Sequence, residues 1–152
     1  MTGGGGFIGT RIVEALHDRG VEVRAGIRSW KSAARVGRLP VDIVPCDVMD
    51  PGQLAAAMSD VTHVVHCARG NERVNVEGTR NVLSTALSLG VERVVHLSTV
   101  SVYGSAQGSV DEETPISITG ADYGDSKIEA ERLCASYQAQ GLSTVILRPT
   151  IV

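Results

Sequence analysis

The sequence predicts an α/β protein in which a parallel sheet carries helices on both faces. Short runs rich in Val, Ile and Leu alternate along the chain with longer amphipathic stretches. This alternation is expected when buried parallel strands are joined by helices. The length of 152 residues suits one domain, and the chain has no internal repeat or low-complexity linker.

Five short runs are the predicted strands. They cover residues 21–27, 41–44, 62–67, 91–97 and 143–147. Four amphipathic stretches are the predicted helices, at residues 7–19, 51–58, 74–89 and 126–140. Asp50 and Pro51 suit the N-cap and first position of the second helix, and Gly20, Gly90 and Gly141 end the other three.

A glycine-rich run opens the chain. Gly3, Gly6 and Gly9 have the spacing of a strand-to-helix turn that binds the pyrophosphate of a dinucleotide. Glycine permits a positive φ and lets backbone N–H groups approach the phosphates, which the helix dipole also favours. Four consecutive glycines also fit a flexible terminus, so this run alone does not decide the function.

Two residues that follow predicted strands extend this dinucleotide interpretation. A cofactor with a free ribose 2′-hydroxyl calls for an acid at the end of the second strand of such a fold, where Ile27 and Arg28 stand instead. Arg28 suits a 2′-phosphate, with Arg11 and Lys31 as helpers, which favours NADP over NAD. Asp47 follows the next strand and suits an adenine amino group. The alternatives are that Arg28 is a solvated surface arginine and that Asp47 is an ordinary loop aspartate.

Three residues in the second half of the chain suit proton transfer. Tyr123 and Lys127 are four residues apart, so on a helix they share one face, where an ammonium favours the phenolate form of tyrosine. Thr99 follows a predicted strand and could bond a substrate oxygen. The segment 98–122 between them is long for a loop in a small domain, which is typical of a functional loop. The alternatives are a chance spacing of Tyr123 and Lys127 and an ordinary hydroxyl-rich turn at Thr99.

Composition argues against several other classes. The net charge is −3, no basic run exceeds two residues and aromatic residues make up 3%, which disfavours nucleic acid as a partner. Three widely spaced cysteines fit neither a zinc site nor a disulfide framework, so we expect no metal and a cytoplasmic protein. Apolar runs are too short for a membrane span.

Together these motifs resemble the extended short-chain dehydrogenase/reductase superfamily, which contains the NAD-dependent epimerases and dehydratases. The resemblance covers essentially the whole chain and consists of motifs in the family's order. They are the glycine pattern at 3, 6 and 9, His66-Cys67-Ala68, Asn75 to Thr79, Ser98-Thr99 with Val102-Tyr103-Gly104, Asp111-Glu112 with Thr114-Pro115, Tyr123 to Lys127, and Arg148-Pro149.

The resemblance implies a Rossmann-type doubly wound sheet of order 3-2-1-4-5-6 and a partial NAD(P)-binding domain over residues 1–152. Relatives have a first strand before the glycines and a substrate-binding region after Arg148-Pro149, and we expect both to be absent here. The predicted strands 21–27 and 62–67, between which that first strand would lie, should then be unpaired on one side or forced together. A further departure is Arg69, which stands where relatives often carry a small residue.

The resemblance also implies an enzyme that transfers a hydride with NADP or NAD, with Thr99, Tyr123 and Lys127 as catalytic residues. The implied cofactor-binding residues are Gly3, Gly6, Phe7, Ile8, Gly9, Arg28, Asp47, Val48, Ala68, Asn75, Tyr123 and Lys127. The expected substrate is a small molecule, first a nucleotide sugar. The alternatives are an NADP-dependent carbonyl, hydroxysteroid or flavonol-type reductase, a non-catalytic NADP-binding module and an inactive fragment. A homodimer is one assembly that the complete enzyme could adopt.

Overall fold

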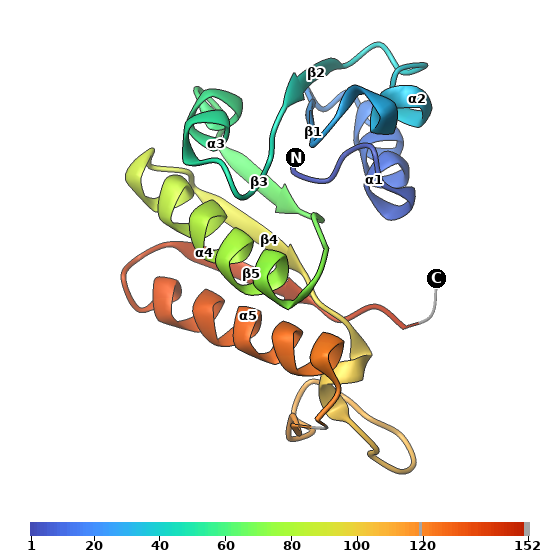
Figure 1. Cartoon of the computed structure of the whole chain (residues 1–152), viewed down its shortest axis with the longest axis vertical. Coiled ribbons are helices and arrows are strands. Elements are labelled where there is room, and N and C mark those ends of the chain that lie inside the picture. Colours follow the sequence, from blue (N-terminus) through green and yellow to red (C-terminus); the bar gives the residue numbers. More distant parts are fainter. Residues whose placement is uncertain (119, 151–152) are drawn as a thin grey trace.

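The strands form two parallel groups in the computed structural model, which describes residues 1–118 and 120–150 (Figure 1). Strands β1 (Arg24–Ile27) and β2 (Asp42–Pro45) pair with each other. Strands β3 (His63–His66), β4 (Arg93–Leu97) and β5 (Ser143–Leu147) pair in the order β3-β4-β5. The predicted parallel α/β architecture is confirmed.

Met1 and Thr2 lie between the two groups of strands. Gly26 N–H donates to the Met1 carbonyl at 2.7 Å on the β1 side. On the β3 side, Thr2 N–H donates to the Val65 carbonyl at 3.0 Å and Cys67 N–H donates to the Thr2 carbonyl at 3.2 Å. On the β1 side the Met1 amino group also donates to the Arg24 carbonyl at 2.7 Å. The expectation that the inner flanks of these strands lack partners or pair directly is therefore wrong for β1 and for the end of β3, because Met1 and Thr2 occupy the place of a central strand.

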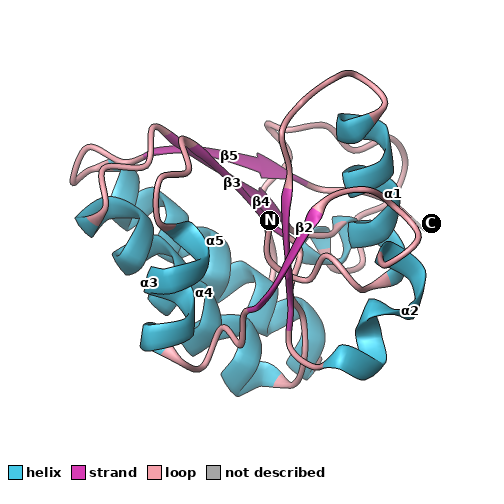
Figure 2. Ribbon diagram, turned by 90° about the horizontal axis from the view of Figure 1, so that it is seen from above, coloured by secondary structure: helices cyan, strands magenta, loops and turns pink. Residues whose placement is uncertain are grey.

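Helices cover the strands from both sides. Helix α1 (Phe7–His17), the short turn η1 (Trp30–Ser32) and α2 (Ala33–Val36) lie on one side of β1 and β2, and α3 (Pro51–Met58) lies on the other (Figure 2). Helices α4 (Glu72–Ser88) and α5 (Asp122–Gln138) pack side by side against β3, β4 and β5. The larger core lies between α3, α4, α5 and the strands and includes Leu54, Val64, Leu83, Val94 and Cys134.

Several element boundaries differ from the predicted ones. Three strands are shorter than expected and β2 is shifted by one residue from the predicted 41–44, so only 143–147 and the helix 51–58 match at both ends. Helix α4 begins earlier because the Asn71 side chain accepts a hydrogen bond from Val74 N–H and caps it. Helix α5 begins at Asp122, where acidic residues in the first turn suit the helix dipole. The expected loop 98–122 contains the short helical turn η2 (Val100–Tyr103), and its Thr119 lies outside the described residues.

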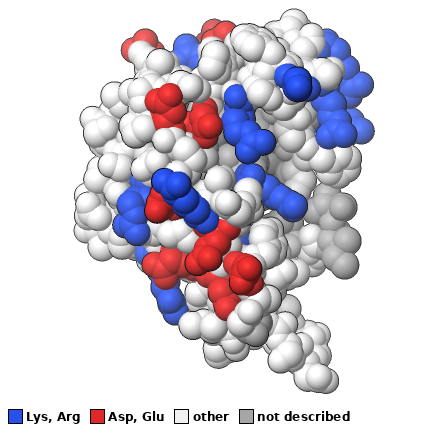
Figure 3. All heavy atoms as spheres, viewed as in Figure 1, with Lys and Arg blue, Asp and Glu red and all other residues white. Residues whose placement is uncertain are grey.

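Charged side chains divide unevenly over the surface. On the face shown in Figure 3, basic side chains group where α2 lies and acidic side chains group over the amino-terminal ends of α4 and α5. Parallel α/β proteins bind ligands at the carboxyl ends of the strands. The candidate site is at those strand ends.

Candidate functional site

Two cavities meet at the carboxyl ends of the strands. The first, of about 280 Å³, lies beside β1 and β2, and the second, of about 530 Å³, lies beside β4 and α5. Residues from the glycine run and from the segment after β3 line both of them: Gly3, Gly6, Cys67, Ala68 and Arg69. The shared wall makes the two cavities suitable for one elongated ligand.

The glycine run forms a turn that side chains would block. Gly3 has φ +70°, and a Cβ there would lie 2.7 Å from the backbone nitrogen of Ala68. A Cβ at Gly9 would collide with the Gly3 carbonyl oxygen. Helix α1 starts after Gly6 with no side-chain cap and no acid in its first turn. Its first N–H groups, at Phe7, Ile8 and Gly9, are therefore available to an anion in the second cavity, which these three residues line.

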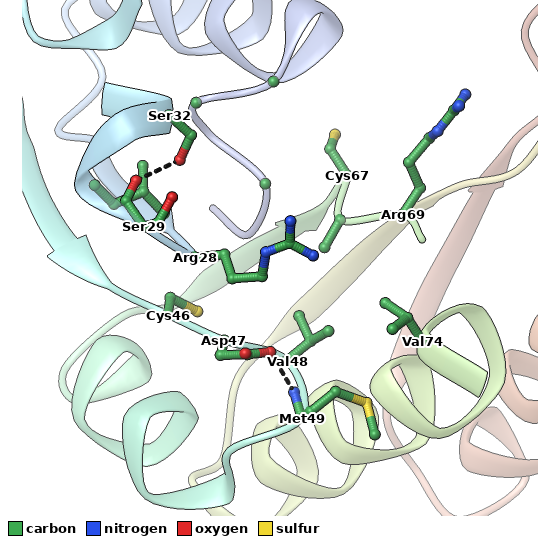
Figure 4. Close-up of a pocket in the computed structure, with 15 residues that line it drawn as sticks. Arg28, Ser29, Ser32, Cys46, Asp47, Val48, Met49, Cys67, Arg69 and Val74 are labelled. Carbon is green, nitrogen blue, oxygen red and sulfur yellow. Dashed lines mark hydrogen bonds between the residues drawn. The ribbon is translucent and has the colours of Figure 1, made fainter. Parts of the chain in front are cut away.

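The first cavity contains the residues predicted for the adenosine end of a cofactor. Arg28 follows β1 and points into the cavity, with Asp47 and Val48 on the wall below it (Figure 4). The Asp47 carboxylate accepts a hydrogen bond from Met49 N–H at 3.0 Å, which fixes its orientation. The predicted helpers Arg11 and Lys31 do not line this cavity, and Arg11 pairs with Glu14 at 2.8 Å.

The second cavity brings the three predicted catalytic residues together. Thr99, Tyr123 and Lys127 all line it, beside the glycine turn. Thr99 precedes η2, and its hydroxyl accepts a hydrogen bond from Ser101 N–H at 3.2 Å. Tyr123 lies in the first turn of α5 and is 41% exposed, so its hydroxyl is accessible to a bound molecule.

Lys127 is buried beneath this cavity. Its Nζ donates to the Leu97 carbonyl at 2.6 Å and lies 3.1 Å from His96 Nε2, and only 3% of the residue is exposed. Burial lowers the pKa of Lys127 to about 8. An ammonium has three N–H donors, and within the described residues only two of these have partners. The third can serve a ligand in the cavity.

Two buried histidines lie behind Lys127. The rings of His66 on β3 and His96 on β4 are 5.2 Å apart. Burial and the neighbouring charge of Lys127 lower the pKa of His66 to about 3, while burial, His66 and Lys127 lower the pKa of His96 to about 2. Both rings are therefore neutral near pH 7, and His96 Nε2 accepts a hydrogen bond from the Lys127 ammonium.

Asn75 is the predicted cofactor-binding residue that the structure places outside both cavities. Its amide donates to the Ser126 hydroxyl at 3.0 Å and accepts from Gly70 N–H at 3.0 Å. These bonds join α4, α5 and the segment after β3, so Asn75 supports the cavity wall. Its direct contact with a cofactor stays a prediction.

A buried network beside Thr99 escaped the sequence-based prediction. Arg148, after β5, makes two hydrogen bonds to the Glu131 carboxylate, at 3.0 and 2.8 Å, and a third to the Tyr103 hydroxyl at 2.8 Å. Glu131 also accepts from the Ser98 hydroxyl at 2.5 Å. The network therefore joins the ends of β4 and β5 to α5. The Arg-Pro motif was the available signal, but nothing in the sequence pairs it with Glu131.

The cysteines contribute no reactive thiolate to the site. Cys67 lines both cavities, but burial raises its pKa to about 11. Burial likewise raises the pKa of Cys46, which lines the first cavity. Among the described residues, no group of three or more His, Cys, Asp or Glu side chains is arranged to hold a metal ion. None of the helices in the described part of the chain is long and apolar enough to span a membrane.

Comparison with known proteins connects this geometry to a family. A model of the NAD dependent epimerase/dehydratase family matches residues 1–152. The dTDP-glucose 4,6-dehydratase of Streptomyces venezuelae, solved as a double mutant with NAD, is 31% identical with a TM-score of 0.86 over 97% of this chain and 53% of that chain. Thermus thermophilus UDP-glucose 4-epimerase, solved with NAD, is 30% identical with a TM-score of 0.85 over 97% and 53%.

Another similar protein is a ketoreductase. The 4-hydroxy-2-methyl-3-oxo-4-farnesyl-3,4-dihydroquinoline-1-oxide ketoreductase of Stigmatella aurantiaca is 31% identical over 164 residues, which cover 100% of this chain and 49% of the relative. The chain thus spans about half the length of such relatives. The similar proteins include both nucleotide-sugar enzymes and a reductase, so similarity alone does not select the substrate.

Proposed function

The chain belongs to the NAD dependent epimerase/dehydratase family, and we propose that it forms the cofactor-binding and proton-transfer half of an NAD(P)-dependent enzyme acting on an alcohol or carbonyl. One observation carries the proposal: Thr99, Tyr123 and Lys127 line the same cavity as the glycine turn. Gly3, Gly6, Gly9 and the first turn of α1 would hold the diphosphate, and the first cavity would hold the adenosine half.

The chain's own residues would handle the proton. When bound, the nicotinamide accepts or donates the hydride. Tyr123, exposed in the cavity, takes a proton from the substrate hydroxyl during oxidation and returns it to the carbonyl oxygen during reduction. Thr99 bonds the same oxygen and orients it. Lys127 is fixed by Leu97 and His96, and its remaining N–H would bond the cofactor ribose.

The first candidate substrate is a nucleotide sugar. The Val102-Tyr103-Gly104 and Asp111 to Pro115 segments support it, as does the overall likeness to the solved dehydratase and epimerase. The second candidate is a ketone reduced with NADP. Arg28 in the first cavity favours it, together with the similarity to the Stigmatella ketoreductase.

Binding and turnover test the proposal in two stages. Calorimetric titration of the chain with NAD⁺ and NADP⁺ should show one site for at least one of them, and Gly9→Val should abolish binding because its side chain would collide with Gly3. Turnover by the longer protein containing this chain is then compared on UDP- and dTDP-sugars and on ketones. Absence of binding to both cofactors would refute the proposed function.

A further inference from the structure

Arg69 occupies a distinctive position between the two cavities. It lies in the segment between β3 and α4, and of the five residues that line both cavities it is the only charged one. Its side chain is directed away from Arg28 (Figure 4). Its guanidinium carbon lies 5.7 Å from the centroid of the Tyr123 ring, a distance at which a cation is attracted to an aromatic face.

The guanidinium has unused binding capacity. No hydrogen bond or ion pair holds Arg69 within residues 1–118 and 120–150, and the residue is exposed. It therefore has five N–H donors in a planar fork that matches phosphate or carboxylate geometry. The Tyr123 ring orients the side chain without using those donors.

The charges of the second cavity favour an anion. Arg69 and Lys127 are the charged residues lining its described part, and no carboxylate lines it. The uncapped start of α1 adds N–H groups of positive partial charge. An anion bound beside the glycine turn would thus meet positive potential from the helix and from Arg69.

We propose that Arg69 binds the diphosphate of the dinucleotide as it passes between the cavities. The inference rests on the proposed function, in which the adenosine half occupies the first cavity and the nicotinamide half the second. The diphosphate joins those halves, so it must pass the shared wall, whose one charged side chain is Arg69. The side chain then complements the backbone N–H groups of the glycine turn.

This role differs measurably from that of Arg28. NAD⁺ and NADP⁺ share the diphosphate but differ at the ribose 2′ position. Arg69→Ala should therefore raise both dissociation constants by the same factor, about 10-fold or more, as expected for loss of a charge-assisted contact. Arg28→Ala should raise only that of NADP⁺. Arg69→Lys should retain part of the affinity, because it keeps the charge and loses the fork.

The experiment is calorimetric titration of the 152-residue chain and its variants with NAD⁺ and NADP⁺ at two salt concentrations. Arg73→Ala is the matched control, because Arg73 is an exposed arginine on α4 that pairs with Glu77 and lines neither cavity. The dissociation constants of Arg73→Ala for both cofactors should stay within about twofold of those of the unsubstituted chain. Thermal unfolding should show that Arg69→Ala remains folded. The dissociation constants of Arg69→Ala should depend less on salt concentration than those of the unsubstituted chain.

The outcomes separate the two proposals. Equal losses of affinity for both cofactors in Arg69→Ala, with none in Arg73→Ala, support the role of Arg69. Unchanged affinities in Arg69→Ala, with binding intact in the unsubstituted chain, would overturn this inference alone and leave an anion on the substrate as the alternative ligand. No binding of either cofactor by the unsubstituted chain would overturn the proposed function and this inference together.

Discussion

At the scale of single residues, Tyr123 and Lys127 differ in environment, and this predicts different consequences of substitution. Tyr123 is exposed in the cavity and Lys127 is buried against β4. Tyr123→Phe should lower turnover by roughly 10²–10⁴, the usual contribution of a positioned acid–base group, while cofactor affinity changes little. Lys127→Ala should reduce both turnover and affinity, because its side chain would hold the cofactor ribose in the cavity that Tyr123 and Thr99 also line.

The measurement is steady-state turnover of the longer enzyme together with cofactor titration. Tyr137→Phe is the control, since Tyr137 lies on the same helix and packs against the core rather than the cavity. Turnover of Tyr123→Phe equal to that of the unsubstituted enzyme would remove Tyr123 from the mechanism.

Arg28 predicts the cofactor preference. Its side chain lies in the first cavity without an acid at the end of β1, so a 2′-phosphate would gain a charge-assisted contact. NADP⁺ should bind about 10–100-fold more tightly than NAD⁺, and Arg28→Ala should abolish the difference. Arg35→Ala, which changes an arginine on α2 outside the cavity, should preserve it. Equal or tighter binding of NAD⁺ by the unsubstituted chain would contradict the prediction.

At the scale of elements, the network of Glu131 and Arg148 joins α5 to the ends of β4 and β5. The Glu131 side chain is 5% exposed and that of Arg148 is 21% exposed. Removing one member of a buried pair leaves the other charge uncompensated, so Glu131→Ala should lower the free energy of unfolding by about 3 kcal/mol. Glu129→Ala removes an exposed pair with Arg132 on the same helix and should cost under about 1 kcal/mol.

Urea unfolding of both variants makes this comparison. Near-equal losses for the two substitutions would mean that the buried network adds no stability beyond that of a surface pair.

The elements also show what could be predicted from the sequence. Asp50 and Pro51 determine the start of α3 locally, and the predicted bounds were correct. Tyr123 lies in the first turn of α5, before the predicted start of that helix at residue 126, because the acidic side chains of Asp122 and Asp125 favour an earlier helix start. The glycine turn is predictable from the spacing of Gly3, Gly6 and Gly9, and the place of Thr99 follows from its position after a predicted strand. The Lys127–His96 and Arg69–Tyr123 contacts depend on side-chain directions between elements, which periodicity does not specify.

At the scale of the whole molecule, the buried histidines predict acid sensitivity. The pKa of His66 is lowered to about 3 and that of His96 to about 2, whereas in the unfolded chain both are near 6.5. Below pH 6.5 the unfolded state binds more protons, so the stability present above that pH is lost as pH falls toward the folded values. The slope approaches about 1.4 kcal/mol per pH unit for each histidine.

Urea unfolding between about pH 5 and 7 measures this slope while most carboxylates stay ionised. His66→Gln should remove about half of it, and His63→Gln, at an exposed position on β3, should leave it unchanged. A slope that persists in His66→Gln would assign the acid sensitivity to other groups.

The central position of Met1 and Thr2 predicts how cooperatively the 152-residue chain unfolds. These residues pair with β1 through Arg24 and Gly26, and on the other side they pair with Val65 of β3 and with Cys67, which follows β3. A longer strand at this position would extend the pairing toward the amino-terminal end of β3, and each buried backbone group without a partner costs about 1–3 kcal/mol. A few such groups are comparable with the typical stability of a domain, about 5–15 kcal/mol. We therefore expect a broad thermal transition for the chain alone.

Adding about six β-branched residues before Met1, enough for a strand of usual length, should give a sharp transition at higher temperature. Calorimetry and near-ultraviolet circular dichroism of the two forms test this, with six Gly and Ser residues as the matched extension. A sharp, reversible transition in the unextended chain would show that Met1 and Thr2 suffice to couple the two groups of strands.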